Sequence, residues 1–228
     1  MNIFKFYKNS LFTVLLLLLV TSCKEIKKDI EVDKSKEEMK STEVVKKIQN
    51  QKLTSDQQII VALLAAPQEV REGAKVYGYD DKGNFITLRG GTNDMVCIAD
   101  NPTKDGFEVV SYHKDLDPYM ARGRELKAAG KSFTERRDIR EEEARDGSLP
   151  MPKKPATLHI LHGENGWFDI DSIKVRSAKY RYVVYIPFAT QASTGLSLKP
   201  NAPGHPWLMF PGKANAHIMI TPPKDENK

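Results

Sequence analysis

Histidine is the side chain best suited to acid–base chemistry or metal binding near neutral pH, and this 228-residue sequence contains five histidines. His113 and His217 lie in expected loops or at expected strand ends, as do the carboxylates Asp94 and Asp115. A histidine beside a carboxylate can take a proton from water, or can bind a metal ion that activates it. These four residues are therefore the candidate catalytic residues.

A second pair of histidines, His159 and His162, is spaced by three residues. On a helix this spacing would place both rings on one face, as metal ligands require. Residues 157–161 predict a strand instead, where positions three apart point to opposite faces. We therefore expect no metal site from this pair. The sequence also has no HExxH, paired CxxC, phosphate-loop or dinucleotide motif, so we expect no cofactor.

The polar run of residues 89–94 is the candidate ligand-binding loop. Its two glycines would let backbone N–H groups approach a ligand, and Arg89, Thr92 and Asn93 add side-chain donors and acceptors. Trp207, which follows a proline in an apolar run, is a candidate for lining a pocket. The alternatives are an ordinary turn between two strands for the loop and a place in the core for Trp207.

The pattern of apolar residues predicts one α+β domain over residues 53–228, with a mixed, mainly antiparallel sheet and two or three helices. Strands are expected at 76–79, 85–88, 95–99, 107–112, 156–161, 173–175, 181–188, 207–210 and 217–220, and a long loop at 189–206. Helices are expected at 59–66, 117–130 and 133–145. Capping residues precede the first helix, Asp117 and Pro118 open the second, and the charged third helix should lie at the surface.

The C-terminal tail is expected to complete the fold. Residues 207–210 form a continuous apolar run, and Ile218 and Ile220 share one face of a strand. Leaving these side chains exposed would create an apolar patch that is uncommon on a soluble domain. His217 lies between Ala216 and Ile218, so its side chain should face the other way, toward solvent or a pocket.

The first 22 residues have the three parts of a secretory signal peptide. Lys5 and Lys8 precede an apolar run at residues 11–20, which is shorter than the roughly 20 residues of a spanning helix. Val20-Thr21-Ser22-Cys23 then resembles a lipobox, the processing site of bacterial lipoproteins. The resemblance implies cleavage before Cys23, diacylglycerol on its thiol, and a fatty acyl chain such as palmitate on the new amine. An uncleaved N-terminal anchor is the alternative.

The predicted processing changes both the number of free cysteines and the net charge of the chain. The sequence has two cysteines, so lipid on Cys23 leaves Cys97 without a partner for an internal disulfide, and its apolar neighbours predict a small buried side chain. Loss of the two lysines within residues 1–22 would lower the formal charge from +5 to +3. Charges of both signs are interspersed, and this balance does not favour a nucleic-acid partner.

Residues 24–51 contain no glycine, proline or aromatic residue and are dense in lysine, glutamate and aspartate. Such a segment has too few apolar side chains to form a core. We therefore predict that residues 23–52 comprise the lipidated cysteine and a charged, flexible tether. A coil of that length spans about 30 Å, so the domain would stand off the membrane.

Four phrases of the domain carry a family resemblance. They are LRGGTND at 88–94, YMARGREL at 119–126, STGL at 193–196, and PWLMFPG at 206–212 continuing to AHIMI at 216–220. Together they resemble a family of exported bacterial proteins whose activity is uncharacterised. The resemblance covers most of residues 60–221. It implies a recurrent domain and no particular activity.

These observations predict a lipid-anchored cell-envelope protein. It would be held at a bacterial membrane through lipid on Cys23, with the outer membrane, facing the periplasm or the cell surface, as the expected location. The absence of a catalytic motif favours a non-catalytic module that binds a ligand or partner. The alternative is a hydrolase or metal-dependent enzyme that uses His113 and His217 with a nearby carboxylate.

Overall fold

The computed structural model describes residues 52–223. These residues belong to one compact unit, Gln49–Lys228. The predicted signal peptide at 1–22, the predicted lipidation site Cys23 and the predicted tether as far as residue 51 lie outside the described residues. The described residues form a single α+β domain with a mixed, mainly antiparallel sheet, which confirms the predicted fold class.

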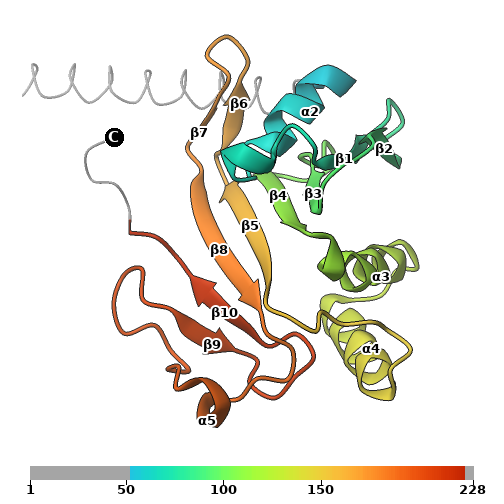
Figure 1. The fold of residues 1–228 in the computed structure, drawn as a ribbon. Coiled ribbons are helices and arrows are strands. Elements are labelled where there is room, and N and C mark those ends of the chain that lie inside the picture. Colours follow the sequence, from blue (N-terminus) through green and yellow to red (C-terminus); the bar gives the residue numbers. More distant parts are fainter. Residues whose placement is uncertain (1–51, 224–228) are drawn as a thin grey trace, which may run out of the picture. The chain divides into compact units, whose positions relative to one another are not determined.

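An eight-stranded sheet forms the centre of the domain (Figure 1). Its strands lie in the order β2-β1-β3-β4-β5-β8-β10-β9, and only β1 and β3 are parallel neighbours. The bounds are β1 Lys75–Tyr79, β2 Phe85–Arg89, β3 Met95–Ile98, β4 Phe107–His113, β5 Ala156–Gly163, β8 Lys179–Tyr185, β9 Trp207–Met209 and β10 His217–Ile220. A separate hairpin of β6 (Trp167–Asp169) and β7 (Lys174–Arg176) is inserted between β5 and β8.

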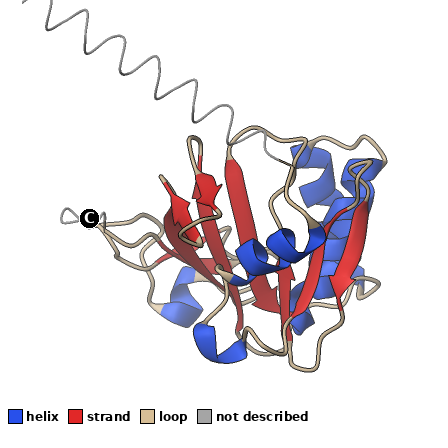
Figure 2. Ribbon diagram, turned by 90° about the horizontal axis from the view of Figure 1, so that it is seen from above, coloured by secondary structure: helices blue, strands red, loops and turns tan. Residues whose placement is uncertain are grey.

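Helices cover both faces of the sheet (Figure 2). α2 (Ser55–Leu63) packs on one face, where Val61 joins Val109 of β4 in a buried cluster. On the other face, Tyr119 of α3 (Asp117–Ala128) joins Tyr112 of the same strand in a second cluster. β4 contributes side chains to both clusters because successive residues of a strand point to opposite faces of the sheet.

The start of α2 is fixed by polar side chains. Thr54 and Gln57 form the capping box that the sequence predicts, each side chain accepting from the other residue's backbone N–H. Gln58 is buried, and its amide pairs with both the N–H and the carbonyl of Tyr79 at 2.9 Å. Gly78 makes room for this contact, because an added Cβ would lie 2.6 Å from the Gln58 Oε1 atom.

α4 (Phe133–Asp146) packs on α3 and has no buried residue of its own, in agreement with its predicted surface position. The Arg122 guanidinium of α3 binds the Glu143 carboxylate of α4 at 2.6–3.0 Å. The Glu141 carboxylate of α4 accepts from the Ala214 N–H at 2.7 Å, and Arg145 donates to the Gly212 carbonyl at 2.8 Å. α4 therefore links α3 to the segment that precedes β10.

The C-terminal strands complete one edge of the sheet. Leu208 of β9 is 1% exposed and Ala216, just before β10, is fully buried. One short strand and one short α-helix were not predicted. β6 was missed, and α5 (Gln191–Thr194) lies within the segment expected to be a loop, between a Thr190 cap and Gly195 in the left-handed conformation. Two 3-10 turns, η1 (Gln68–Val70) and η2 (Lys114–Leu116), complete the fold.

The connections gather at the two ends of the sheet because of the strand directions. At one end lie the turn at 80–84, the loop at 99–106 and residues 163–178 with the β6–β7 hairpin. We call it the hairpin end. At the other end, the far end, lie residues 90–94, 114–118, 150–155 and 186–189.

Candidate functional site

A cavity of about 870 Å³ opens at the far end of the sheet. It lies among the start of β1, the loop before β3, η2, the start of α3 and the segment between α4 and β5. We call it the lysine pocket, because four lysines line it: Lys75, Lys114, Lys153 and Lys154. Its apolar lining includes Met95, Val96, Ala121 and Met151.

The loop before β3 forms one wall and is held by backbone contacts. The N–H groups of Thr92 and Asn93 both donate to the Gly73 carbonyl, at 2.8 and 3.1 Å. The Asn93 side chain donates to the Val70 carbonyl at 2.7 Å. Gly91 is required at this place, because an added Cβ would come within 2.8 Å of the Lys75 backbone nitrogen.

Residues 149–155, which we call the proline strap, form the opposite wall. Leu149 is buried in the cluster beneath α3, and its N–H donates to the Glu143 carbonyl at 2.8 Å. Pro152 is also buried, while Lys153 and Lys154 are exposed. Three prolines restrict this segment, so both lysines are presented from a backbone with few alternative conformations.

The four lysines differ in their partners. The Lys114 ammonium lies 2.7 Å from the Asp94 carboxylate, and this contact lowers the pKa of Asp94 and raises that of Lys114. Lys75 donates to the Tyr77 hydroxyl at 2.6 Å. Within residues 52–223, no carboxylate lies within ion-pair distance of Lys75, Lys153 or Lys154. Three ammonium groups of the pocket are thus not neutralised by a described side chain.

Two carboxylates also line the pocket, Asp115 and Asp117. Asp117 accepts from the Tyr112 hydroxyl at 2.8 Å and lies 3.2 Å from the Arg124 guanidinium. Its charge is therefore balanced by a cation of α3. With four lysines against two aspartates among the lining residues, the pocket is positive.

Three of the four catalytic candidates lie together, and one of them, Asp115, lines the pocket. The His113 ring is 3.8 Å from the Asp94 carboxylate through Nε2 and 3.6 Å from the Asp115 carboxylate through Nδ1. Nδ1 also accepts from the Asp115 backbone N–H at 3.3 Å. Both side-chain distances exceed a normal hydrogen bond, and His113 itself is not among the lining residues.

The fourth candidate, His217, lies elsewhere. β5 and β8 separate its strand from that of His113, a distance of roughly 14 Å at about 4.8 Å for each strand spacing. His217 is 6% exposed, with the rings of Tyr185 and Phe210 at 5.2 and 5.8 Å. The expectation that it faces solvent or a pocket is wrong, because the Phe210 segment covers it. Burial lowers its pKa, so the neutral ring is favoured.

Of the four ligand-binding candidates, one lines the lysine pocket and three do not. Asn93 lines the lysine pocket, whereas Thr92 is exposed outside its lining. The Arg89 guanidinium donates to the carbonyls of Arg71 and Ala74 at 2.7 Å, so it fixes the backbone before β1. Trp207 lies on the edge strand β9, paired with Met219, and does not line the pocket.

His159 and His162 point to opposite faces of β5, as predicted. His159 meets the Tyr182 ring at 5.6 Å, on the face of α2, whereas His162 lies on the face that carries Leu158. Within residues 52–223, no group of three or more His, Cys, Asp or Glu side chains is arranged to hold a metal ion. Cys97 is buried, as predicted, and burial raises its thiol pKa to about 12.

Sequence reasoning missed the lysines as site residues. Lys153 and Lys154 could have been identified from the sequence, since two adjacent lysines between prolines are expected at the surface. Lys75 gives no such signal, because only the parallel pairing of β1 with β3 brings it beside the candidate loop.

Comparisons with protein-family models, with curated protein sequences and with solved structures found no match to this chain. The resemblance of the four sequence phrases to exported bacterial proteins therefore stays a prediction. Among residues 52–223, no helix is long and apolar enough to cross a membrane.

Proposed function

We propose that this chain is a lipid-anchored envelope protein whose domain binds an anionic, partly apolar ligand in the lysine pocket and performs no chemistry on it. One observation carries the proposal: four lysines surround a cavity of about 870 Å³ whose remaining lining is largely apolar. Small-molecule sites are typically about 300–1,000 Å³ and combine apolar walls with a few polar groups.

The lining indicates the chemistry of the ligand. Met95, Val96 and Met151 offer an apolar surface, and methionine adapts to ligands of different shape. Lys153 and Lys154 lie on the strap, where an anionic group would find two ammonium groups without described carboxylate partners. A carboxylate or phosphate attached to an apolar body meets both requirements.

Binding is favoured over catalysis by the position of His113. A general base must lie within hydrogen-bond reach of its substrate and is usually held by a hydrogen-bonded carboxylate. His113 does not line the pocket, and its nearest carboxylates are 3.6 and 3.8 Å away. A site that joins His113 directly to His217 would have to span two intervening strands.

Isothermal titration of the protein with decanoate and with decyltrimethylammonium tests the proposal. The two probes share an apolar chain and differ in the sign of the head group. Decanoate should bind, more weakly as salt is added, and decyltrimethylammonium should not. Equal binding of both probes, or of neither, would overturn the proposal.

A charge reversal locates the site. Lys153→Glu with Lys154→Glu should weaken decanoate binding at least tenfold. Lys82→Glu with Lys104→Glu makes the same change in net charge at exposed positions of the hairpin end and should leave binding unchanged. Equal weakening by both pairs would mean that net charge, and not the pocket, governs binding.

The anchor requires its own test. Cys23→Ser should abolish labelling of the protein by radioactive palmitate and leave the unprocessed precursor, because only the thiol accepts diacylglycerol. Equal label on the parent and the variant would exclude lipidation at Cys23.

A further inference from the structure

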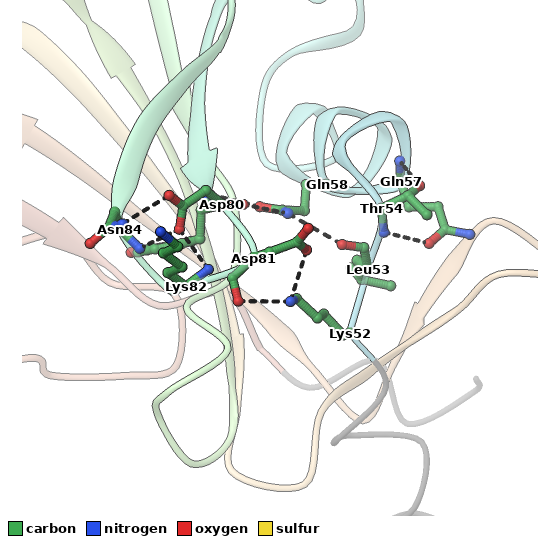
Figure 3. Close-up of polar contacts among 10 residues, drawn as sticks. Lys52, Leu53, Thr54, Gln57, Gln58, Asp80, Asp81, Lys82 and Asn84 are labelled. Atoms are coloured by element: carbon green, nitrogen blue, oxygen red, sulfur yellow. Dashed lines mark hydrogen bonds and ion pairs between the residues drawn. The ribbon is translucent and has the colours of Figure 1, made fainter.

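The described part of the domain begins at the hairpin end, where Lys52 and Leu53 make polar contacts (Figure 3). The Lys52 ammonium binds the carboxylate and the backbone carbonyl of Asp81, both at 2.8 Å, in the turn after β1. The Gln58 amide donates to the Leu53 carbonyl at 3.3 Å. These contacts fix the start of the described domain beside the turn at 80–84.

The β6–β7 hairpin extends from the same end of the sheet (Figure 1). Its base is anchored by Phe168, which is buried, and by Val175, its cross-strand partner. Leu53 packs against this same buried cluster. The base of the hairpin and the start of the domain therefore share one small core.

The tip of the hairpin exposes apolar side chains. Ile170 is 36% exposed and Ile173 is 54% exposed. Ile173 also has a φ of 53°, a left-handed conformation that is unfavourable for a β-branched residue. Neither the apolar exposure of these two side chains nor the unfavourable backbone conformation of Ile173 is offset by burial of the tip within the domain. Half-buried Trp167 stands at the base of the same hairpin, and tryptophan is enriched where proteins meet the membrane interface.

The charges of the hairpin permit contact with an anionic surface. Asp169 is paired with Arg176 at 3.1 Å. Lys174 and Lys179 are exposed, while Asp171 is the other acidic residue between positions 167 and 179. Three basic residues against two acidic ones give residues 167–179 a formal charge of +1, so the hairpin itself is not repelled by anionic phospholipid.

We propose that Ile170 and Ile173 at the tip of the β6–β7 hairpin insert into the interfacial region of the bilayer that holds the lipid anchor. The inference rests on the proposed lipid anchor. Residues 24–51 would join that anchor to the hairpin end, and tethering raises the effective concentration of the tip at the bilayer, so a weak interaction suffices. The lysine pocket would then face away from the membrane, beyond the roughly 27 Å length of the eight-residue strand β5.

Depth-dependent quenching of Trp167 fluorescence tests this orientation. Residues 24–228, which contain the whole compact unit Gln49–Lys228, carry an N-terminal hexahistidine in place of the lipid. They are bound to phosphatidylglycerol–phosphatidylethanolamine vesicles that contain a nickel-chelating lipid and brominated acyl chains. Trp207→Phe leaves Trp167 as the single tryptophan, and a thermal melt checks that this background is folded. Brominated lipid should quench Trp167.

Two variants separate membrane contact from a structural role. Ile170→Ser with Ile173→Ser should reduce the quenching at least twofold, whereas Phe133→Ser, at an exposed apolar residue of α4, should not change it. Ile173→Gly should reduce the quenching and also raise the melting temperature, by about 1–3 °C, because glycine accepts the positive φ. No quenching of the parent, or equal quenching of the parent and the serine variant, would overturn the insertion. Because nickel replaces the lipid, such a failure would not bear on acylation of Cys23, which the palmitate label tests.

Discussion

Buried and half-buried titratable residues of this domain respond to pH in opposite directions. His159, His162 and His217 have pKa values lowered by burial, so the fold favours their neutral rings and loses stability as the pH falls below about 6.5. Asp100 behaves in the reverse way. Burial raises its pKa to about 6, although its carboxylate accepts from the Glu108 N–H at 2.9 Å.

We expect Asp100→Asn to stabilise the domain at alkaline pH. The folded pKa of Asp100 lies above its unfolded value, so its contribution to stability is present below about pH 4 and is lost as the pH rises to about 6. Asparagine keeps an oxygen for the Glu108 N–H and carries no charge. Urea unfolding should show a gain of about 1–2 kcal/mol at pH 8 that shrinks toward zero near pH 4.

Asp105→Asn is the matched control for this prediction, because Asp105 is an exposed carboxylate in the same loop. It should change stability by less than about 0.5 kcal/mol at either pH. An Asp100→Asn gain that is the same at pH 4 and pH 8 would contradict the argument from burial of charge.

Single residues also show the limit of sequence reasoning. Strand alternation correctly placed His217 on the face opposite Ile218. It could not show that Phe210, seven positions earlier, would fold over that face. What covers a strand face depends on tertiary packing, and so the side chain assigned to solvent or a pocket is in the core.

At the scale of elements, α3 and α4 approach each other closely at Gly123, where the Arg140 side chain of α4 packs on α3. The Arg140 guanidinium lies 4.0 Å from the Tyr119 ring centroid and donates to the Tyr119 carbonyl at 3.2 Å. It fits because residue 123 is glycine, where an added Cβ would lie 2.8 Å from the Arg140 Nη1 atom. A glycine inside a helix costs about 0.5–1 kcal/mol relative to alanine. The contact between Arg140 of α4 and Tyr119 of α3 offsets the cost of placing glycine at position 123.

A double-mutant cycle measures the coupling between Gly123 and Arg140. In the Arg140→Ala background, Gly123→Ala should stabilise the domain by about 0.5–1 kcal/mol, the intrinsic preference of a helix for alanine. In the parent, Gly123→Ala should be neutral or destabilising, because the methyl group displaces the guanidinium. Chemical denaturation of the four proteins gives the coupling energy, which we expect to be about 1 kcal/mol. Equal effects in both backgrounds would show that Gly123 does not serve Arg140.

Helices and strands with strong local signals were predictable. The capping box at Thr54 and the left-handed Gly147 after α4 mark helix ends through their own side chains and backbone. β6 was not predictable, since three residues that pair only with β7 give too short a pattern. The lysine pocket was not predictable either, because its lysines are spread between positions 75 and 154 and meet only after the strands pair.

At the scale of the whole molecule, the last two strands are expected to be essential. Truncation after Pro206 removes β9 and β10, exposes the edge of β8 and uncovers Tyr185, whose ring packs against His217. Such a chain should lose its cooperative thermal transition in calorimetry, because several buried side chains, at about 1.5–3 kcal/mol each, rival a typical net stability of about 5–15 kcal/mol. A chain ending at Pro223 keeps every described residue and should melt like the parent. A cooperative melt of the shorter chain near the parent temperature would show that the tail is peripheral.

The order of strands across the sheet has a consequence for synthesis. From β3 through β4 and β5 to β8, each strand pairs with the strand of the eight-stranded sheet made before it, so a growing chain can add each new strand to an edge that already exists. β9 pairs only with β10, so β10 must be synthesised before β9 can join the sheet. β9, which is three residues long, then forms the edge of the sheet next to β10. A short edge strand is a poor template for another chain. Until β10 is made, that edge is instead the seven-residue β8, and we expect the nascent protein to be most prone to aggregation at this stage.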